Sequence, residues 1–280
     1  MHGVSRVRVA GVDGGVRWWN ADVSDTDAVH RLVQSVQPDL IFNLAGETRA
    51  ARTLDLVLPT FRTNLAGTVN LLAAAAKFGC HKIVLTGSLE EPTDASGEPP
   101  SSPYAASKLA GNAYGRMFHA VFGVPVVGLR VFMVYGPGQT ELQKLVPHTI
   151  LELLRGQAPK LSSGRREVDW VYVDDVVDAF IAAASVDAGV GHTLEIGSGE
   201  LVSVRDVVER IGRRVAPDRA LRFGAVEDRP MEQVRAADTS AAEAILGWRP
   251  STTLDVGLER TVAWYSRFAE RGADTPQQRS

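Results

Sequence analysis

The chain carries two apolar, strand-like segments separated by one helical segment, and this alternation constrains its fold more than any other feature. Residues 82–88 form a β-branched run that ends in small residues, and residues 125–135 form a second such run that ends in a turn. Between them, Ser102 and Pro103 precede a segment of helical character. A strand, a helix and a second strand in this order predict a βαβ unit with parallel strands.

Tyr104 and Lys108 are four residues apart in this predicted helix, so they lie on the same face of it. A lysine ammonium beside a tyrosine favours the phenolate, because an opposite charge lowers the pKa of an acid. Such a tyrosine can take a proton from an alcohol while a hydride leaves the same carbon. Ser88 ends the preceding strand, and ligands of open α/β sheets bind at the carboxyl ends of the strands. We therefore predict a catalytic site that contains Ser88, Tyr104 and Lys108.

The composition excludes several classes of protein. The 280 residues are 45% hydrophobic and 22% charged, which is ample for a full core. A formal net charge of -3 without a basic stripe argues against nucleic-acid binding, and no apolar run approaches the ~20 residues of a membrane span. The six histidines are scattered, so we expect no metal site. One cysteine, Cys80, cannot form an internal disulfide, and we expect a cytoplasmic protein.

The alternation continues outside the central unit. We predict helices over residues 25–36, with Ser24 as the N-cap, and over residues 61–78, 145–155 and 202–215. Residues 39–43 and 193–197 are expected to be strands, and the latter returns to the sheet. This order of elements predicts an α/β fold whose parallel sheet has helices on both faces.

Taken in order, these motifs resemble the extended short-chain dehydrogenase/reductase family, in particular its NAD-dependent epimerases and dehydratases of nucleotide sugars. The resemblance covers about residues 16–265, and residues 171–176 and 246–250 match later family signatures. It implies a Rossmann-type doubly wound parallel sheet, without the first strand and helix, and a small C-terminal α+β substrate lobe. The resemblance then implies a cofactor domain over residues 1–139 with 168–198, and a substrate-binding lobe over residues 140–167 with 199–270. Residues 271–280 would be a disordered tail.

The resemblance also implies roles for individual residues. Ser88, Tyr104 and Lys108 match the catalytic serine or threonine, tyrosine and lysine of the family. Asp22 and Val23 look like its adenine-contacting pair. The residues that the resemblance implies in binding NAD or NADP are Asp22, Val23, Leu44, Ala45, Gly46, Asn64, Tyr104, Lys108 and Phe132. Phe132 has a second interpretation as a core residue, since aromatic side chains dominate protein cores.

Three arginines are implied in binding a nucleotide-diphosphate sugar. Arg229 matches the position at which family members contact the pyrophosphate, and Arg165 and Arg166 lie in a basic loop that would assist. A guanidinium can contact phosphate with two parallel hydrogen bonds. Where many relatives have an asparagine and an arginine that touch the diphosphate, this chain has Met133 and Val168, so the substrate is expected to depart from a standard UDP-hexose.

The loop after Ser88 is acidic. Glu90 falls where some sugar dehydratases place a catalytic glutamate, whereas Leu89 stands where one dehydratase branch has an acidic residue. The alternative is that Glu90 and Glu91 are simply charges on a solvated loop.

The N-terminal segment departs from the family. Family members begin with a strand, a glycine-rich turn and a helix, whose backbone approaches the cofactor pyrophosphate. Here residues 1–10 are interpreted as the second strand, and Gly11, Gly14 and Gly15 as a hairpin or loop before a third strand at residues 16–22. If residues 7–10 end that strand, Asp13 would grip the ribose. Either an upstream segment precedes Met1 or part of the cofactor site is lost, and we expect weak cofactor binding by the chain as given.

The sequence thus predicts an NAD(P)-dependent nucleotide-sugar epimerase or dehydratase that acts by Tyr104-assisted hydride transfer at a sugar carbon. An NAD(P)H-dependent 4-keto-sugar reductase is the alternative enzyme. A degenerate, non-catalytic binding or scaffold protein is the alternative of another class, and a tightly bound nicotinamide cofactor would distinguish it from an enzyme. A homodimer is the assembly that we consider.

Overall fold

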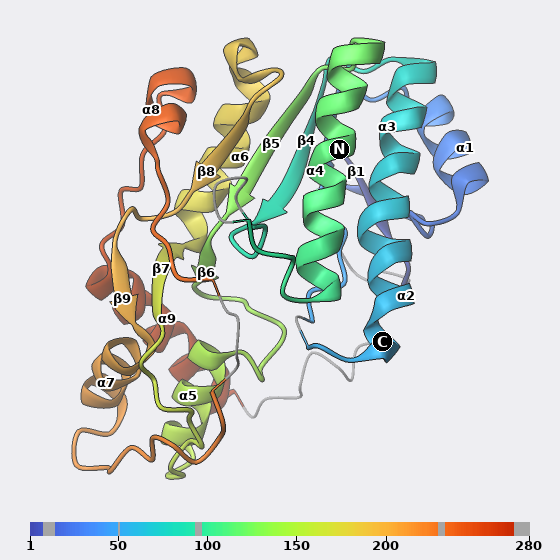
Figure 1. Ribbon diagram of the computed structural model, residues 1–280. Coiled ribbons are helices and arrows are strands. Elements are labelled where there is room, and N and C mark those ends of the chain that lie inside the picture. The colour runs from blue at the N-terminus through green and yellow to red at the C-terminus, as the bar shows by residue number, and fades with distance from the viewer. Residues whose placement is uncertain (8–14, 50, 93–96, 229–232, 272–280) are drawn as a thin grey trace. The chain divides into compact units, whose positions relative to one another are not determined.

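The computed structural model describes residues 1–7, 15–49, 51–92, 97–228 and 233–271 (Figure 1). The chain forms two compact units. The first contains Met1–Arg130 and Phe180–Leu194, and the second contains Val131–Ala179 and the described residues from Glu195 onward.

The first unit carries most of the α/β alternation. Its elements are β1 (His2–Ser5), β2 (Arg17–Asn20), α1 (Thr26–Val36), β3 (Leu40–Asn43), η1 (Leu54–Leu56), α2 (Val57–Thr60), the π-helix η2 (Phe61–Ala66), α3 (Gly67–Phe78), β4 (Lys82–Ser88), α4 (Pro103–Phe122), β5 (Val126–Val131) and η3 (Asp187–Gly189). Two further elements, α6 (Val173–Ser185) and β8 (Thr193–Ile196), begin in one unit and end in the other, and the last residue of β5, Val131, also belongs to the second unit. The predicted strands at 39–43, 82–88 and 193–197 are confirmed.

The strands form separate sheets. One has the order β3-β4-β5-β8, with β3 parallel to β4, and the other pairs β1 with β2 in parallel. The sequence predicts a hairpin or a loop between these strands, and the parallel pairing of β1 and β2 excludes the hairpin alone, because a hairpin joins antiparallel strands. β1 also ends at Ser5, so Val7 is not part of it. Gly11, Asp13 and Gly14 lie outside the described residues.

Two further predictions need correction. The run at residues 125–135 is not one strand: it breaks at Phe132 into β5 and β6 (Met133–Tyr135), which belong to different sheets. The N-cap of α1 is Asp25 and not Ser24, because the Asp25 side chain accepts a hydrogen bond from the Ala28 amide. Both errors are local: Ser24 and Asp25 are both residue types that cap helices, and the apolar run continues through Phe132.

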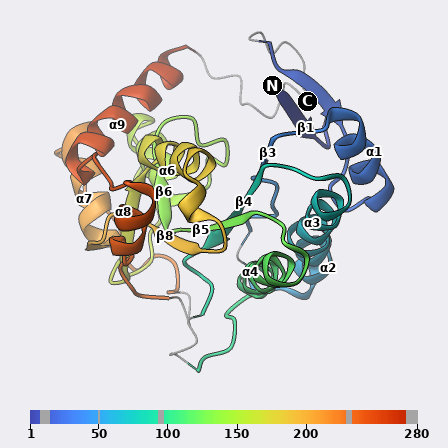
Figure 2. The same ribbon diagram turned by 90° about the horizontal axis from the view of Figure 1, so that it is seen from above.

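Helix α4 is positioned by small residues and a well-formed start. The Ser102 side chain accepts a hydrogen bond from the Ala105 amide at 3.1 Å, and Pro103 occupies the first turn. A Cβ atom at Gly115 would lie 2.8 Å from Leu85 Cδ1, so the glycine lets α4 approach β4 closely. Figure 2 shows α1, α3 and α4 side by side along one face of the first unit.

The second unit is built on a three-stranded sheet. Its elements are β6, α5 (Leu145–Leu154), β7 (Glu167–Tyr172), β9 (Leu201–Ser203), α7 (Val204–Val215), α8 (Ser240–Leu246) and α9 (Leu254–Glu270). β7 is parallel to β6 and antiparallel to β9. Helices α5, α7 and α9 pack on one another around a core that includes Ile150, Ile211 and Tyr265. The helix predicted over 202–215 therefore begins two residues later, after β9.

Candidate active site

Ser88, Tyr104 and Lys108 come together at the carboxyl end of β4. The Ser88 hydroxyl is hydrogen bonded to the Tyr104 phenol, and Ser88 Oγ also accepts a hydrogen bond from the Glu90 amide at 3.2 Å. Lys108 Nζ lies 5.8 Å from the centre of the Tyr104 ring and donates to the carbonyl oxygen of Thr86 at 2.8 Å. The i, i+4 spacing on α4 places the phenol of Tyr104 and the ammonium of Lys108 on one face of the helix. The end of β4 brings the Ser88 hydroxyl to them.

The electrostatics of this pair differ from the sequence-based expectation. Burial raises the pKa of the Tyr104 phenol; the hydrogen bond with Ser88 lowers it, and the carboxylates of Glu91 and Glu90 raise it. The expectation that Lys108 would bring the net pKa of Tyr104 down is wrong for this structure, because burial and the two carboxylates outweigh the lowering effect. Burial also lowers the pKa of Lys108 to about 8, and the negative charge of Glu91 opposes this shift.

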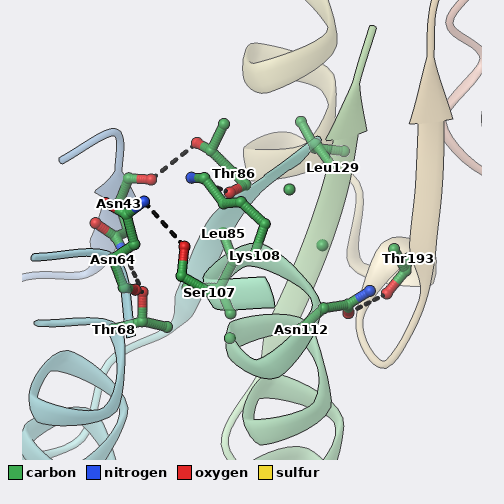
Figure 3. A pocket seen from close by; sticks show the side chains of 13 residues that line it. Asn43, Asn64, Thr68, Leu85, Thr86, Ser107, Lys108, Asn112, Leu129 and Thr193 are labelled. Carbon is green, nitrogen blue, oxygen red and sulfur yellow. Dashed lines mark hydrogen bonds between the residues drawn. The ribbon is translucent and has the colours of Figure 1, made fainter. Parts of the chain in front are cut away.

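Asn64 joins the loop after β3 to α4. It lies in the π-helical segment η2, a type of turn that is frequent at functional sites. Its Oδ1 accepts from the Glu47 amide at 2.7 Å, and its Nδ2 donates to the Glu47 carbonyl and to Ser107 Oγ, both at 3.0 Å. The bond between Asn64 and Ser107 is visible in Figure 3. The side chain therefore ties the loop after β3 to α4, and its contact with a cofactor stays a prediction.

The loop after β3 passes beside Lys108 and presents an apolar surface. A Cβ atom at Gly46 would lie 3.9 Å from Lys108 Nζ. Leu44 is 65% exposed, and Ala45 is exposed as well. Exposed apolar residues beside a polar cluster are suited to the flat ring of a cofactor.

Buried polar groups continue from this loop into the unit. Thr86 Oγ1 donates to the Asn43 carbonyl at 2.8 Å, Asn43 Nδ2 donates to Thr68 Oγ1 at 2.9 Å, and Thr68 Oγ1 donates to the Asn64 carbonyl at 2.6 Å. These groups line a small polar cavity with Lys108 (Figure 3). Because each buried polar group has a partner, the network fixes the ends of β3 and β4 relative to α3 and α4.

Asp22 and Val23 follow β2 in the first unit. The Asp22 carboxylate accepts a hydrogen bond from the Ser24 amide at 2.8 Å, and this bond is the main cause of its lowered pKa. Val23 packs on α3, since a Cβ atom at Gly67 would lie 2.7 Å from Val23 Cγ2. Both residues stabilise the turn, and their contact with an adenine stays a prediction.

The two arginines of the basic loop have protein partners in the second unit. Arg165 is exposed; its Nε donates to Ser163 Oγ at 3.2 Å, and its Nη2 lies 3.5 Å from Asp228 Oδ2. Arg166 is half-buried and donates to the Gln233 carbonyl at 3.0 Å. Arg165 is therefore available to an anion at low cost, whereas Arg166 is already engaged in the fold.

Phe132 and Arg229 are two other residues that the sequence predicted for the site. Phe132 is buried in the second unit, where the guanidinium of Arg235 lies 4.7 Å from the centre of its ring. This agrees with the core interpretation of Phe132, and its contact with a cofactor stays a prediction. Arg229 lies outside the described residues.

Sequence reasoning missed several polar residues that the structure places around the site. Glu91 is completely buried, so the interpretation of this residue as a solvated loop charge is wrong. Ser107 and Asn112 of α4 were not predicted either. A single polar residue on a helix has no distinctive spacing, and only the packing of α4 on β4 shows that these side chains point inward.

Within the described ranges, no helix is both long and apolar enough to cross a membrane. The same part of the chain holds no group of three or more histidine, cysteine, aspartate or glutamate side chains placed to bind a metal ion.

Curated relatives of this chain are nucleotide-sugar enzymes. It is 31% identical to a dTDP-glucose 4,6-dehydratase of Haemophilus influenzae over 277 residues, which covers 87% of this chain and 81% of the relative. It is 33% identical to a UDP-glucose 4-epimerase of Mycolicibacterium smegmatis over 258 residues, which covers 88% and 81%.

Solved structures share the fold. A UDP-glucose 4-epimerase from Thermotoga maritima superimposes with a TM-score of 0.86 at 23% identity, over 96% of this chain and 91% of the other. A UDP-glucuronic acid 4-epimerase from Bacillus cereus, solved with NAD, gives a TM-score of 0.80 at 24% identity, over 90% and 82%. A sequence profile of the NAD dependent epimerase/dehydratase family matches residues 2–197. This match and the curated relatives show that the chain belongs to the NAD-dependent epimerase/dehydratase family.

Proposed function

We propose that this protein catalyses NAD-dependent hydride transfer at a sugar carbon of a nucleotide-diphosphate sugar. The observation that carries the proposal is the cluster of Ser88, Tyr104 and Lys108, in which the serine and tyrosine side chains are hydrogen bonded and the ammonium lies 5.8 Å from the phenol ring centre. The substrate class is supported by the curated relatives, which are named as dTDP-glucose dehydratases and UDP-glucose epimerases.

When bound, NAD would supply the acceptor and later the donor of a hydride. Tyr104 Oη takes the proton of the sugar hydroxyl as its carbon loses a hydride, and returns a proton to the carbonyl oxygen when that carbon is reduced. Ser88 Oγ donates a hydrogen bond to the same oxygen, where negative charge would otherwise develop. Lys108, as a cation, favours the phenolate form of Tyr104 once substrate and cofactor enclose the pair.

The first unit is proposed to hold the cofactor. Gly46 borders Lys108 and would face the nicotinamide side together with Leu44 and Ala45, while Asp22 and Val23 would meet the adenine. The second unit is proposed to be the substrate lobe, in which Arg165 and Arg166, with Arg229, contact the diphosphate. Guanidinium groups suit this role because they remain charged and present paired donors.

Epimerisation is proposed ahead of dehydration. Elimination of water requires a group that protonates the leaving hydroxyl, and Leu89 is a buried apolar residue at the position of the acidic residue in one dehydratase branch. Glu90 is half-buried and remains the candidate acid or base for an elimination. A 4-keto-sugar reductase uses the same Ser88 and Tyr104 chemistry in one direction only.

The test is an assay of the protein with NAD on a panel of UDP- and dTDP-sugars, followed by mass analysis of the products. An epimerase leaves the mass unchanged, a dehydratase removes one water, and a reductase adds two hydrogens with NADH. Tyr104→Phe should reduce turnover at least about a hundredfold, because acid-base groups contribute roughly 10²–10⁴-fold. Near-normal turnover by this variant on the true substrate would refute the assignment of Tyr104.

We also propose that two copies associate through one helical face of the first unit. On this face α4 exposes Tyr114, Met117 and Val121, which are three and four residues apart and therefore lie along one side of the helix. Contiguous exposed apolar side chains mark interaction sites, and a twofold axis lets one patch meet itself. Sedimentation of the wild type and of Val121→Glu should show a dimer and a monomer respectively.

With its lone Cys80, the protein is proposed to work in the cytoplasm.

A further inference from the structure

Glu91 inserts a carboxylate beneath the candidate active site. Its side chain is completely buried, and Oε1 accepts a hydrogen bond from the backbone amide of Ser88 at 2.7 Å. A Cβ atom at Gly87 would lie 2.6 Å from this oxygen, so only glycine leaves room for the carboxylate at that position. Gly87 and Glu91 therefore fit together: the glycine leaves the space that the Glu91 carboxylate fills at the end of β4.

The second carboxylate oxygen faces two other elements. Oε2 lies 3.3 Å from Asn112 Nδ2 of α4 and 3.4 Å from the Arg130 guanidinium of β5. Asn112 is held in turn by Thr193 Oγ1, which donates to Asn112 Oδ1 at 2.9 Å (Figure 3). A buried carboxylate is costly unless paired, and this set of donors fixes its position between the loop, α4 and β5.

We propose that Glu91 is a positioning residue of the reaction, which fixes the main chain that carries Ser88 and holds a buried negative charge beneath the cluster. The inference rests on the proposed function of the Ser88, Tyr104 and Lys108 cluster. It goes beyond that cluster because Glu91 touches neither the hydroxyl of Tyr104 nor a reacting atom, and acts through its neighbours.

The surrounding charges agree with this role. Glu90 lies on the same loop, Tyr104 and Lys108 lie on α4, and Arg130 lies on β5. Among them, the negative charge of Glu91 raises the pKa of both Lys108 and Tyr104. Without Glu91, burial alone would act on Lys108, and more of the lysine would be neutral near pH 8.

The experiment compares Glu91→Gln, which removes the charge at nearly constant shape, with Glu91→Asp, which keeps the charge on a shorter side chain. Lysine is labelled with ¹³C at Cε, and the Lys108 signal is assigned by its loss in Lys108→Arg. The titration of Lys108 is followed by NMR in each protein, and the pH profile of turnover is recorded in parallel. Asp169→Asn, a change at a buried carboxylate of the second unit, is the matched control.

The proposal expects Glu91→Gln to lower the Lys108 midpoint by about half a pH unit or more. It expects turnover to fall roughly tenfold to a hundredfold, because a small misplacement of a catalytic group costs that much. Glu91→Asp should keep the Lys108 midpoint and still lose turnover, because its shorter side chain cannot hold the Ser88 amide. If Glu91→Gln fails to fold, the Glu91→Asp result decides the positioning role.

An unchanged Lys108 midpoint in Glu91→Gln, or full turnover in Glu91→Asp, would overturn the proposal. The same midpoint shift in Asp169→Asn would also overturn it, since the effect would then be a general consequence of a loosened fold. The NMR titration needs no turnover, so an inactive wild type would refute the proposed function while the role of Glu91 toward Lys108 is still decided.

Discussion

Glu91 of the first unit and Asp169 of the second are buried carboxylates that are satisfied in different ways. Asp169 is 1% exposed and accepts four hydrogen bonds from neutral donors: the amide and hydroxyl of Ser198, at 2.6 and 2.8 Å, and the amides of Gly199 and Ala237, both at 2.9 Å. Glu91 has one short bond to a backbone amide, and two longer contacts that include a cation.

The difference shows what each carboxylate is for. Neutral donors tie β7 to the segments around Ser198 and Ala237, which is a role in stability. Around Glu91, the neighbours are titratable groups whose pKa values depend on its charge. Strongly perturbed groups that gather in one place are typical of functional sites.

The largest effect is expected at Lys108. Lys108→Met should reduce turnover about a hundredfold or more, because the ammonium beside Tyr104 is lost from the proposed catalytic cluster. The free energy of unfolding should change by only about 1 kcal/mol, since the loss of the bond to the Thr86 carbonyl is offset by removal of a buried charge. Steady-state kinetics and urea unfolding measure the two quantities. If Lys108→Met is unfolded or fully active, the region around Glu91 does not differ from the region around Asp169 in serving activity more than stability.

The opposite pattern is expected in the second unit. Asp169→Asn leaves buried amides facing an NH₂ group, and each buried donor without a partner costs about 1–3 kcal/mol. We expect the free energy of unfolding to fall by about 2–4 kcal/mol, with the pH profile of turnover unchanged at a temperature where the variant is folded. Urea unfolding at neutral pH is the measurement. A loss below about 1 kcal/mol would show that the Asp169 network is not a principal support of this unit.

The pH dependence of stability tests the burial of Lys108. Its pKa is about 8 in the folded chain against an ordinary value of 10.5, so between these values the unfolded chain binds more protons. The free energy of unfolding of the wild type should therefore rise with pH relative to Lys108→Met across this window, by about 1.4 kcal/mol per pH unit at most. Below about pH 8 the difference should be constant. Parallel curves from pH 8 to pH 10 would mean that Lys108 titrates as an exposed lysine.

The smallest effect is expected at the exposed edge of the second unit. Arg165→Ala should weaken the binding of UDP-glucose about tenfold, the loss expected for hydrogen bonds to a charged group. Stability should stay within about 0.5 kcal/mol, because exposed ion pairs contribute little. Arg155→Ala is the matched control, since Arg155 has a similar exposed pair with Glu152. Calorimetric titration measures the affinity of each variant for UDP-glucose. Equal affinities of Arg165→Ala and Arg155→Ala would remove Arg165 from the proposed substrate site.

Sequence patterns predicted the part of the site that depends on regular spacing. Tyr104 and Lys108 share a face because a helix repeats every 3.6 residues, and Ser102 with Pro103 marks the start of that helix. The strand that ends at Ser88 was predicted with its correct bounds, because its apolar, β-branched run is continuous. The family resemblance rested partly on these same positions.

Patterns failed where the outcome depended on distant contacts. The sequence alone specified an α/β alternation and the placement of Ser88, Tyr104 and Lys108 on its central elements, since both follow from local periodicity. Only the tertiary structure decided that β1 and β2 run parallel and that Glu91 turns inward, beneath Ser88, instead of into solvent. Strand pairing and the burial of a charge are set by groups far away in the chain, here Asn112 and Arg130 for Glu91, and local spacing contains no record of them.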